Sequence, residues 1–244
     1  MIKHIINKSF DSISEHLKIC LVIALCVPIL EFLFMKSGLI YIFTYEWSDT
    51  YTIGNYLSIF FYDILWTYLG TIVAVYFHNS VILNQRKFNF FSKSIIKYFV
   101  FILIFFSLST PLEYFMSFGP TLPSLVVLAM FISFCFFLFL CLFFLWSLYL
   151  PNIATKHEYN FWYVIKKSKG FRLTMVYQVI FLIILFLPCM ITLLLPVMGT
   201  YLFMFFGALI GCYGIFMLSH TYLLWEESLK SQWREKFYIH LFWF

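Results

Sequence analysis

Residues 131–146 read FISFCFFLFLCLFFLW, a run without a single charged side chain. Strands of a membrane β-barrel alternate apolar and polar side chains, because one face meets lipid and the other meets the lumen. This run does not alternate, and continuous apolarity is typical of a membrane-crossing helix, which bonds its backbone polar groups internally. The run therefore predicts an all-α membrane protein.

The composition of the whole chain favours the same class. Of its 244 residues, 63% are hydrophobic and only 11% are charged. A water-soluble domain of this size does not bury so many apolar side chains, so lipid must solvate much of the surface. The formal net charge is +5, but apolar runs separate the basic residues and leave no broad wet face, which argues against nucleic acid as a partner.

Six segments are long and apolar enough to cross a bilayer about 30 Å thick, which takes about 20 helical residues. We expect spans at residues 17–35, 57–78, 97–117, 122–150, 172–195 and 200–225. Residues 1–244 then form one polytopic membrane domain, and residues 226–244 form a cytoplasmic tail at the membrane interface.

The distribution of basic residues predicts the orientation of these spans. All but one of the 16 lysines and arginines fall on the side that both termini share, and the exception is Lys36. Basic residues stay on the cytoplasmic side during insertion, so we expect both termini in the cytoplasm. Frequent Phe, Ile, Tyr, Lys and Asn are typical of an AT-rich genome, bacterial or organellar, and composition does not choose between the two.

Cations and aromatic rings gather in the connection between the fourth and fifth spans, where residues 148–173 read LYLPNIATKHEYNFWYVIKKSKGFRL. Cations attract anionic headgroups on the cytoplasmic leaflet, and aromatic rings favour the membrane interface. The candidate lipid-contact residues in this connection and in the one between the second and third spans are Arg86, Lys87, Lys93, Lys166, Lys167, Lys169 and Arg172.

An internal repeat is one interpretation of the layout. A shift of 71 residues aligns residues 78–91 with residues 149–162, and a second equal shift brings His78 onto His220. The chain then consists of three two-span units, each opening with a cytoplasmic interfacial helix. The alternative is that aromatic-rich membrane sequences match by chance.

The interfacial helices of this layout show helical periodicity. Phe10, Ile13, Leu17 and Cys20 share one predicted face, and Asp11, Glu15 and Lys18 lie on another. Residues 88–95 repeat the pattern with Phe88, Phe91 and Ile95. Amphipathic segments of this kind lie along the membrane surface.

Asp63 is the deepest ionisable residue of the predicted spans. A carboxylate inside a span costs several kcal/mol unless it is paired or hydrated, which makes it a functional hypothesis. Together with Tyr62, Trp66 and Tyr68 it would form the proton or cation site of a small transporter or channel component. Alternatively, the span begins at Ile53 and the neighbouring Tyr and Trp side chains satisfy an interfacial carboxylate.

Other polar and small residues predict structural roles. His78 and His220 fall at cytoplasmic span ends without ligands at metal-binding spacing, so we expect interfacial histidines. The six cysteines lie in apolar runs, where thiols behave as small hydrophobes. Gly207, Gly211 and Gly214 form a face suited to close helix packing.

No pattern for catalysis appears in the chain. GxSxG, HExxH and Walker A sequences do not occur. The sequence therefore predicts a protein that is not an enzyme, with no metal and no cofactor.

The segment YLPNIATKHEYNFWYVIKKSKGFRLTMVYQVIF resembles a known family in the placing of Pro151, Glu158, Ser168 and Gly170. It is similar to the YciC-like bacterial inner-membrane proteins and to the related membrane domain of some glycerophosphodiester phosphodiesterases. The resemblance implies a six-span inner-membrane protein and carries over no catalytic residues. The chain departs from that pattern in its heavier Phe and Tyr content and its scarcity of Ala and Gly.

The sequence thus favours a non-enzymatic integral membrane protein. Its expected partners are membrane lipids with anionic headgroups, together with other membrane proteins or further copies of the same chain. The alternative is the transporter or channel component built around Asp63.

Overall fold

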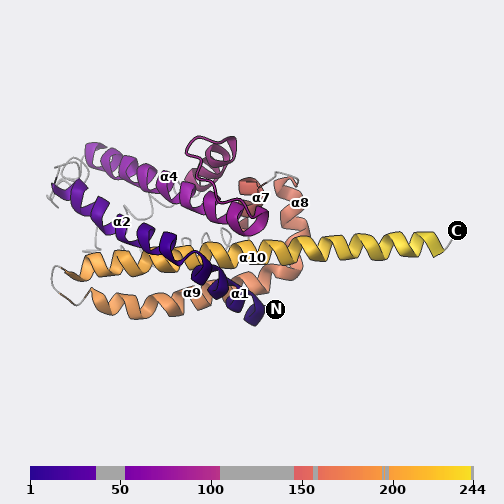
Figure 1. The fold of residues 1–244 in the computed structure, drawn as a ribbon. Helices are drawn as coiled ribbons and strands as arrows, with labels where there is room; N and C mark the ends of the chain where they lie inside the picture. The colour runs from indigo at the N-terminus through magenta and orange to yellow at the C-terminus, as the bar shows by residue number, and fades with distance from the viewer. Residues whose placement is uncertain (37–52, 105–145, 156–158, 194, 196–197, 243–244) are drawn as a thin grey trace, which may run out of the picture.

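The computed structural model describes residues 1–36, 53–104, 146–155, 159–193, 195 and 198–242 (Figure 1). In these ranges every regular element is a helix, which confirms the all-α prediction for them. The elements are α1 (Ile2–Glu15), α2 (Leu17–Lys36), α4 (Ile53–Leu83), an unlabelled helix at residues 93–104, α7 (Tyr149–Thr155), α8 (Phe161–Lys167), the 3₁₀ helix η1 (Ser168–Phe171), α9 (Arg172–Thr192) and α10 (Met198–Phe242).

Among the described residues, three helical stretches are long and apolar enough to cross a membrane. They are Leu17–Phe34, Phe161–Thr192 and Met198–Ser231. Two of the underlying helices match predicted spans closely, because α2 covers residues 17–36 and α9 covers residues 172–192. The predicted spans at 97–117 and 122–150 fall largely outside the described residues.

The connection before α9 contains the short helix α8; its position at the membrane interface stays a prediction. Asn160 caps α8, and its side-chain oxygen accepts a hydrogen bond from the backbone N–H of Tyr163 at 2.8 Å. Such a cap satisfies one of the free N–H groups at a helix start. The 3₁₀ turn η1 then leads directly into α9.

The helix α10 is the central element of the bundle. It packs against α2, α4 and α9, and α1 lies across it (Figure 1). Between α2, α4 and α10, the side chains of Cys20, Tyr76, Phe77, Cys212 and Phe216 form one buried cluster. Burial of Cys20, Cys189 and Cys212 confirms the prediction for these three thiols, whereas Cys26 is exposed.

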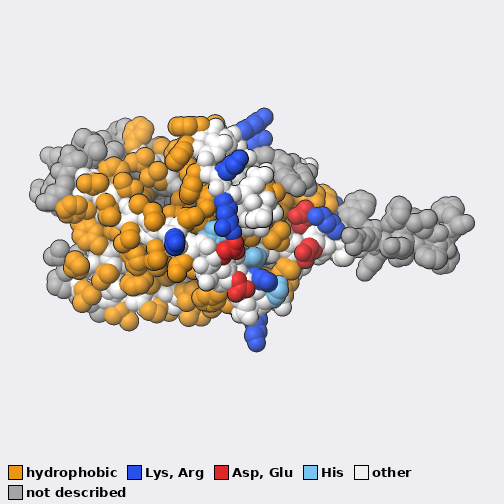
Figure 2. Space-filling model, in the orientation of Figure 1, with side chains coloured by type: hydrophobic (Ala, Val, Ile, Leu, Met, Phe, Trp, Pro, Cys, Tyr) orange, Lys and Arg blue, Asp and Glu red, His pale blue; other side chains and the backbone are white. Residues whose placement is uncertain are grey.

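Large apolar side chains cover much of the outer surface (Figure 2). Leu187 and Ile191 on α9 are 60% and 65% exposed, and Val22 and Ile29 on α2 are similar. Soluble monomers rarely expose apolar patches larger than a few hundred Å². The surface is therefore typical of helices that face lipid.

The prediction of a second interfacial helix around residues 88–95 is wrong for most of that segment. Residues 84–92 form no helix, and Asn84 adopts a left-handed conformation with φ 53° directly after the end of α4. Asparagine tolerates this conformation, which reverses the chain. The following loop folds back along α4, where Tyr68 donates a hydrogen bond to the Phe90 carbonyl at 2.6 Å.

The side chains that α1 buries against the protein are mostly not those of its predicted apolar face. Ile5, Ser9 and Ser12 are the buried side chains of α1, whereas Phe10 and Leu17 are exposed. Lipid solvates Phe and Leu well, while hydroxyl groups need hydrogen-bond partners that only the protein supplies. That this helix lies along the membrane surface stays a prediction.

No break separates the predicted sixth span from the predicted tail. The helix α10 is 45 residues long and extends beyond the bundle (Figure 1). Its continuation follows from the sequence, because neither Gly nor Pro occurs between Gly214 and Phe242. That residues 226–244 lie at the membrane interface stays a prediction.

The glycines of α10 do not share one role. A Cβ atom on Gly207 would approach the Phe186 ring to 3.5 Å, and one on Gly214 would approach Leu182 to 3.2 Å. These two glycines therefore bring α9 and α10 close together, as predicted. A Cβ atom on Gly211 would meet nothing within 4 Å, so Gly211 serves no such packing.

Candidate functional site

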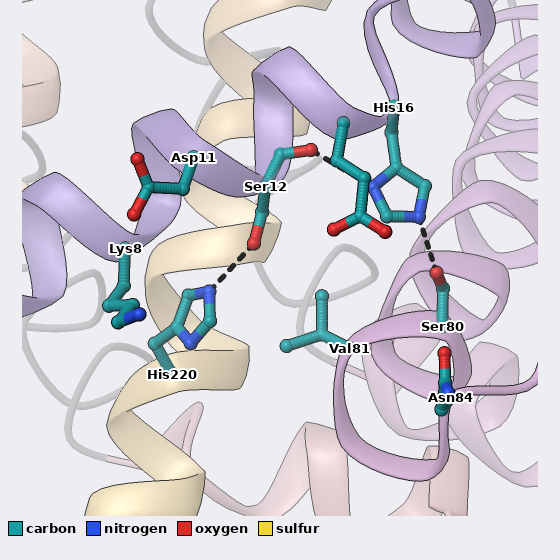
Figure 3. Close-up of a pocket in the computed structure, with 9 residues that line it drawn as sticks. Lys8, Asp11, Ser12, His16, Ser80, Val81, Asn84 and His220 are labelled. Carbon is teal, nitrogen blue, oxygen red and sulfur yellow. Dashed lines mark hydrogen bonds between the residues drawn. The ribbon is translucent and has the colours of Figure 1, made fainter.

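A polar pocket lies where α1 crosses α4 and α10 (Figure 3). Its volume is about 260 Å³, and we call it the histidine pocket. Its lining residues are Lys8, Asp11, Ser12, Glu15, His16, Ser80, Val81, Asn84 and His220. The pocket thus joins the N-terminal helix to one end of the bundle.

The His16 side chain links α1 to α4. Its Nδ1 atom lies 2.9 Å from the Ser12 carbonyl oxygen, which accepts only, so Nδ1 carries the proton. Its Nε2 atom, 2.5 Å from Ser80 Oγ, then accepts the Ser80 hydroxyl proton. With 5% of His16 exposed, both bonds lie in the protein interior.

Ser12 and His220 link α1 to α10. Ser12 Oγ lies 2.8 Å from His220 Nε2, and the two side chains point toward each other in Figure 3. A serine–histidine pair of this length is the first part of a nucleophilic site. Acyl transfer also needs N–H donors for an oxyanion, and the backbone N–H of Ser12 is inside α1. The Ser12–His220 pair is therefore a hydrogen bond that links α1 to α10.

His78 lies in a second buried group beside the histidine pocket. Its Nδ1 is 2.7 Å from Ser219 Oγ, and the Ser219 hydroxyl itself donates to the Ile215 carbonyl. Nδ1 of His78 therefore donates, and Nε2 accepts from the Tyr98 hydroxyl at 3.2 Å. His78 is 0% exposed, so its ring faces the protein interior and not lipid headgroups, and its depth in the membrane stays a prediction.

Further polar pairs lie at the same end of the bundle. Gln178 on α9 donates to Thr221 on α10, and Tyr222 on α10 donates to Asn152 on α7 at 3.2 Å. Together with the histidine groups these pairs form a polar layer, defined by Ser12, His16, His78, Ser80, Tyr98, Asn152, Gln178, Ser219, His220, Thr221 and Tyr222. This layer connects α1, α4, α7, α9, α10 and the helix at residues 93–104.

Most of this polar layer is not predicted by the sequence. One signal was present, because Ser9, Ser12 and His16 recur at helical spacing on one face of α1. Their partners stand in two short polar triplets, HNS at residues 78–80 of α4 and SHT at residues 219–221 of α10, each within an otherwise apolar stretch.

An ion pair closes the outer edge of the histidine pocket. Arg86, in the loop after α4, binds the Glu15 carboxylate of α1, and about half of each side chain is exposed. Exposed pairs contribute about 0–1 kcal/mol. Arg86, a predicted lipid contact, therefore has a partner within the protein.

The other predicted lipid-contact residues lie on the surface. Five of them are exposed and Arg172 is half-buried; the exposed ones are Lys87, Lys93, Lys166, Lys167 and Lys169. Figure 2 shows lysine and arginine side chains gathered toward the end of the bundle from which α10 extends. Contact of these residues with lipid stays a prediction.

The site predicted around Asp63 falls partly outside the described residues, because the side chains of Tyr62 and Asp63 are not among them. The Trp66 ring lies 6.3 Å from the Phe34 ring of α2, between centroids. Tyr68 binds the loop after α4 instead. The two described members of the predicted set thus have different partners.

Metal binding finds no support in the part of the chain that the structure describes. No group of three or more His, Cys, Asp or Glu side chains there could hold a metal ion.

No family model, curated protein or solved structure matches this chain. The resemblance to the YciC-like proteins therefore stays a prediction.

Proposed function

We propose that the chain is a six-span integral membrane protein with both termini in the cytoplasm. Its predicted lipid-contact residues form a cytoplasmic rim, which binds anionic phospholipid headgroups. One observation carries this proposal: the exposed lysines and arginines gather toward one end of a bundle whose remaining described surface is largely apolar (Figure 2). An apolar band bordered by cations and aromatic rings is the surface that a bilayer and its headgroups solvate.

The placing of the chain ends supports an even number of spans. Tyr213 of α10 donates a hydrogen bond to the Ile6 carbonyl of α1 at 3.2 Å, and Ser12 Oγ lies 2.8 Å from His220 Nε2, so the N-terminal helix lies beside the middle of α10. Figure 1 shows the N-terminus at the same end of the bundle from which α10 leaves. Both ends on one side of a membrane require paired crossings.

The number six rests on length and composition. The 31 residues of α4 span about 46 Å at about 1.5 Å per residue, enough to cross the hydrocarbon layer. The segments at 97–117 and 122–150 supply two more crossings in this proposal. We place the protein in a bacterial or organellar inner membrane, where it acts through lipid and through other membrane proteins or copies of itself.

The lipid preference of the rim tests the proposal. The full chain is reconstituted with spin-labelled phosphatidylglycerol or phosphatidylcholine, and the fraction of each lipid at the protein boundary is measured. We expect phosphatidylglycerol to be favoured, since each cation near the surface contributes about 1 kcal/mol. Reversal of Lys166, Lys167 and Lys169 to Glu should remove most of the preference.

The matched control is Lys36→Glu, which changes the one cation predicted for the other leaflet. It should leave the preference of the cytoplasmic rim unchanged. Equal boundary fractions of the two lipids around the unmodified chain, or an unaltered preference in the triple variant, would contradict the proposal.

A further inference from the structure

An apolar groove lies between α2 and α4, with α10 as its floor. Its volume is about 470 Å³. Val22, Cys26 and Leu30 line it from α2, Gly70 from α4 and Gly211 from α10. Apolar spaces of this kind stay free of water, because water finds no polar partners in them.

The groove exists because two glycines leave it open. A Cβ atom on Gly70 or on Gly211 would meet nothing within 4 Å. Gly214, one turn further along α10, is instead covered by Leu182 of α9. The space beside Gly70 and Gly211 is therefore room that no described neighbour fills.

The loop after α4 forms one end of the groove. Phe88 and Phe90 contribute to its wall. The Phe88 ring stacks on Tyr76 with centroids 3.9 Å apart, and the hydrogen bond from Tyr68 holds the Phe90 carbonyl. These contacts fix the loop against α4, so the end of the groove has a defined position.

The same loop brings positive charge next to the groove. Lys87 precedes Phe88 directly and is exposed, and Arg86 is held nearby by Glu15. An apolar groove with a cation near its end is complementary to a molecule that has an apolar chain and an anionic head. Anionic phospholipids have this chemistry, and they surround the protein in its membrane.

We propose that the groove holds one acyl chain of an anionic phospholipid, whose phosphate contacts Lys87. The inference rests on the membrane location in the proposed function and adds a specific lipid site to it. A partner helix fits the space less well, because a helix about 10 Å wide and 30 Å long occupies roughly 2,400 Å³. An acyl chain is thin enough to enter between α2 and α4.

Lipid retention tests the site. The full chain is purified in mild detergent, and bound phospholipid is counted by native mass spectrometry. We expect about one retained anionic phospholipid per chain, and about tenfold weaker retention in Gly70→Leu and Gly211→Leu, the loss expected when about two methylene groups are excluded. Gly170→Leu is the matched control, since Gly170 has equal room but lies outside the groove.

The headgroup contact has its own variant. Lys87→Gln should keep a bound phospholipid but lose the preference for phosphatidylglycerol over phosphatidylcholine. A wild-type chain that retains no phospholipid would overturn the proposal. So would full retention in both glycine variants.

Photo-crosslinking covers the case in which a glycine variant fails to fold. Wild-type protein is reconstituted with phosphatidylglycerol that carries a diazirine in its acyl chain, and modified peptides are mapped. We expect crosslinks around Cys26 and Gly211; crosslinks confined to the outer face of α9 would overturn the proposal.

Failure of the lipid site is distinguishable from failure of the proposed function. Reversal of Lys166, Lys167 and Lys169 should leave the retained phospholipid in place, because these residues do not line the groove. If the triple variant loses the lipid preference of the rim but still retains the phospholipid in the groove, both the proposed function and the lipid site are supported. An unchanged rim preference with a kept groove lipid contradicts the rim alone.

Discussion

His16 illustrates how single polar residues hold this bundle together. Its ring bonds to Ser12 within α1 and to Ser80 of α4, and it contacts the Phe77 and Phe216 rings. In an environment of apolar helices, a buried hydroxyl finds no water to replace a missing partner. Each link of the polar layer therefore fixes the relative position of two helices.

Replacement of His16 by Leu should destabilise the protein. The change keeps side-chain bulk but leaves the buried Ser80 hydroxyl without its partner, which costs about 1–3 kcal/mol. The thermal unfolding midpoint in detergent measures the loss. His4→Leu, at an exposed position of the same helix, is the control. Equal midpoints for both variants would show that the His16 links contribute nothing.

Replacement of Asp63 by Asn separates the proposed function from the transporter alternative. If the protein acts through lipid and partner association, Asp63→Asn should leave expression and the lipid preference of the rim unchanged. Proton and cation fluxes into vesicles containing the wild type or the variant should also be the same. A flux carried by the wild type and lost in the variant would favour a transport site at Asp63.

Among the elements, the hairpin of α9 and α10 depends most on close packing. Gly207 and Gly214 face α9, and the turn that joins the two helices places Gly199 beside the backbone of Thr192. The Gly199 N–H donates to the Leu195 carbonyl at 3.1 Å, which tightens this turn. A side chain larger than hydrogen at residue 199 has no room.

Replacement of Gly199 by Ala should therefore disrupt the turn. The added methyl group would collide with the Thr192 carbonyl, and overpacking of this kind costs about 1–3 kcal/mol. Gly211→Ala is the matched control, because its methyl group would enter open space. Unfolding midpoints in detergent compare the two, and a Gly199→Ala variant as stable as the control would contradict this description of the turn.

For the whole molecule, the positions of the apolar helices could be predicted from the sequence. The sides by which these helices pack against each other could not. Continuous apolarity predicted α2 and α9 to within a few residues, because the bilayer sets the length of a span. The packing of α1 did not follow from its apolar period, because Ser12 is buried against other helices while Phe10 is exposed. A hydroxyl group needs a partner in the protein, whereas lipid solvates a Phe ring.

The candidate site was harder to predict than the helices. Ser12 and His220 are 208 residues apart, and nothing in their local sequence pairs them. The loop after α4 was predicted as a helix from its apolar period, but the left-handed Asn84 reverses the chain first. Both errors arise where tertiary contacts override a local pattern.

The central claim is an even number of crossings with the cations in the cytoplasm, and cysteine labelling tests it most directly. Lys3→Cys, Lys36→Cys and Lys230→Cys are expressed in separate full-length chains, with wild type as the background. A membrane-impermeant maleimide should label residue 36 in intact cells and residues 3 and 230 only after permeabilisation. Labelling of residues 3 and 230 from opposite sides would contradict the account.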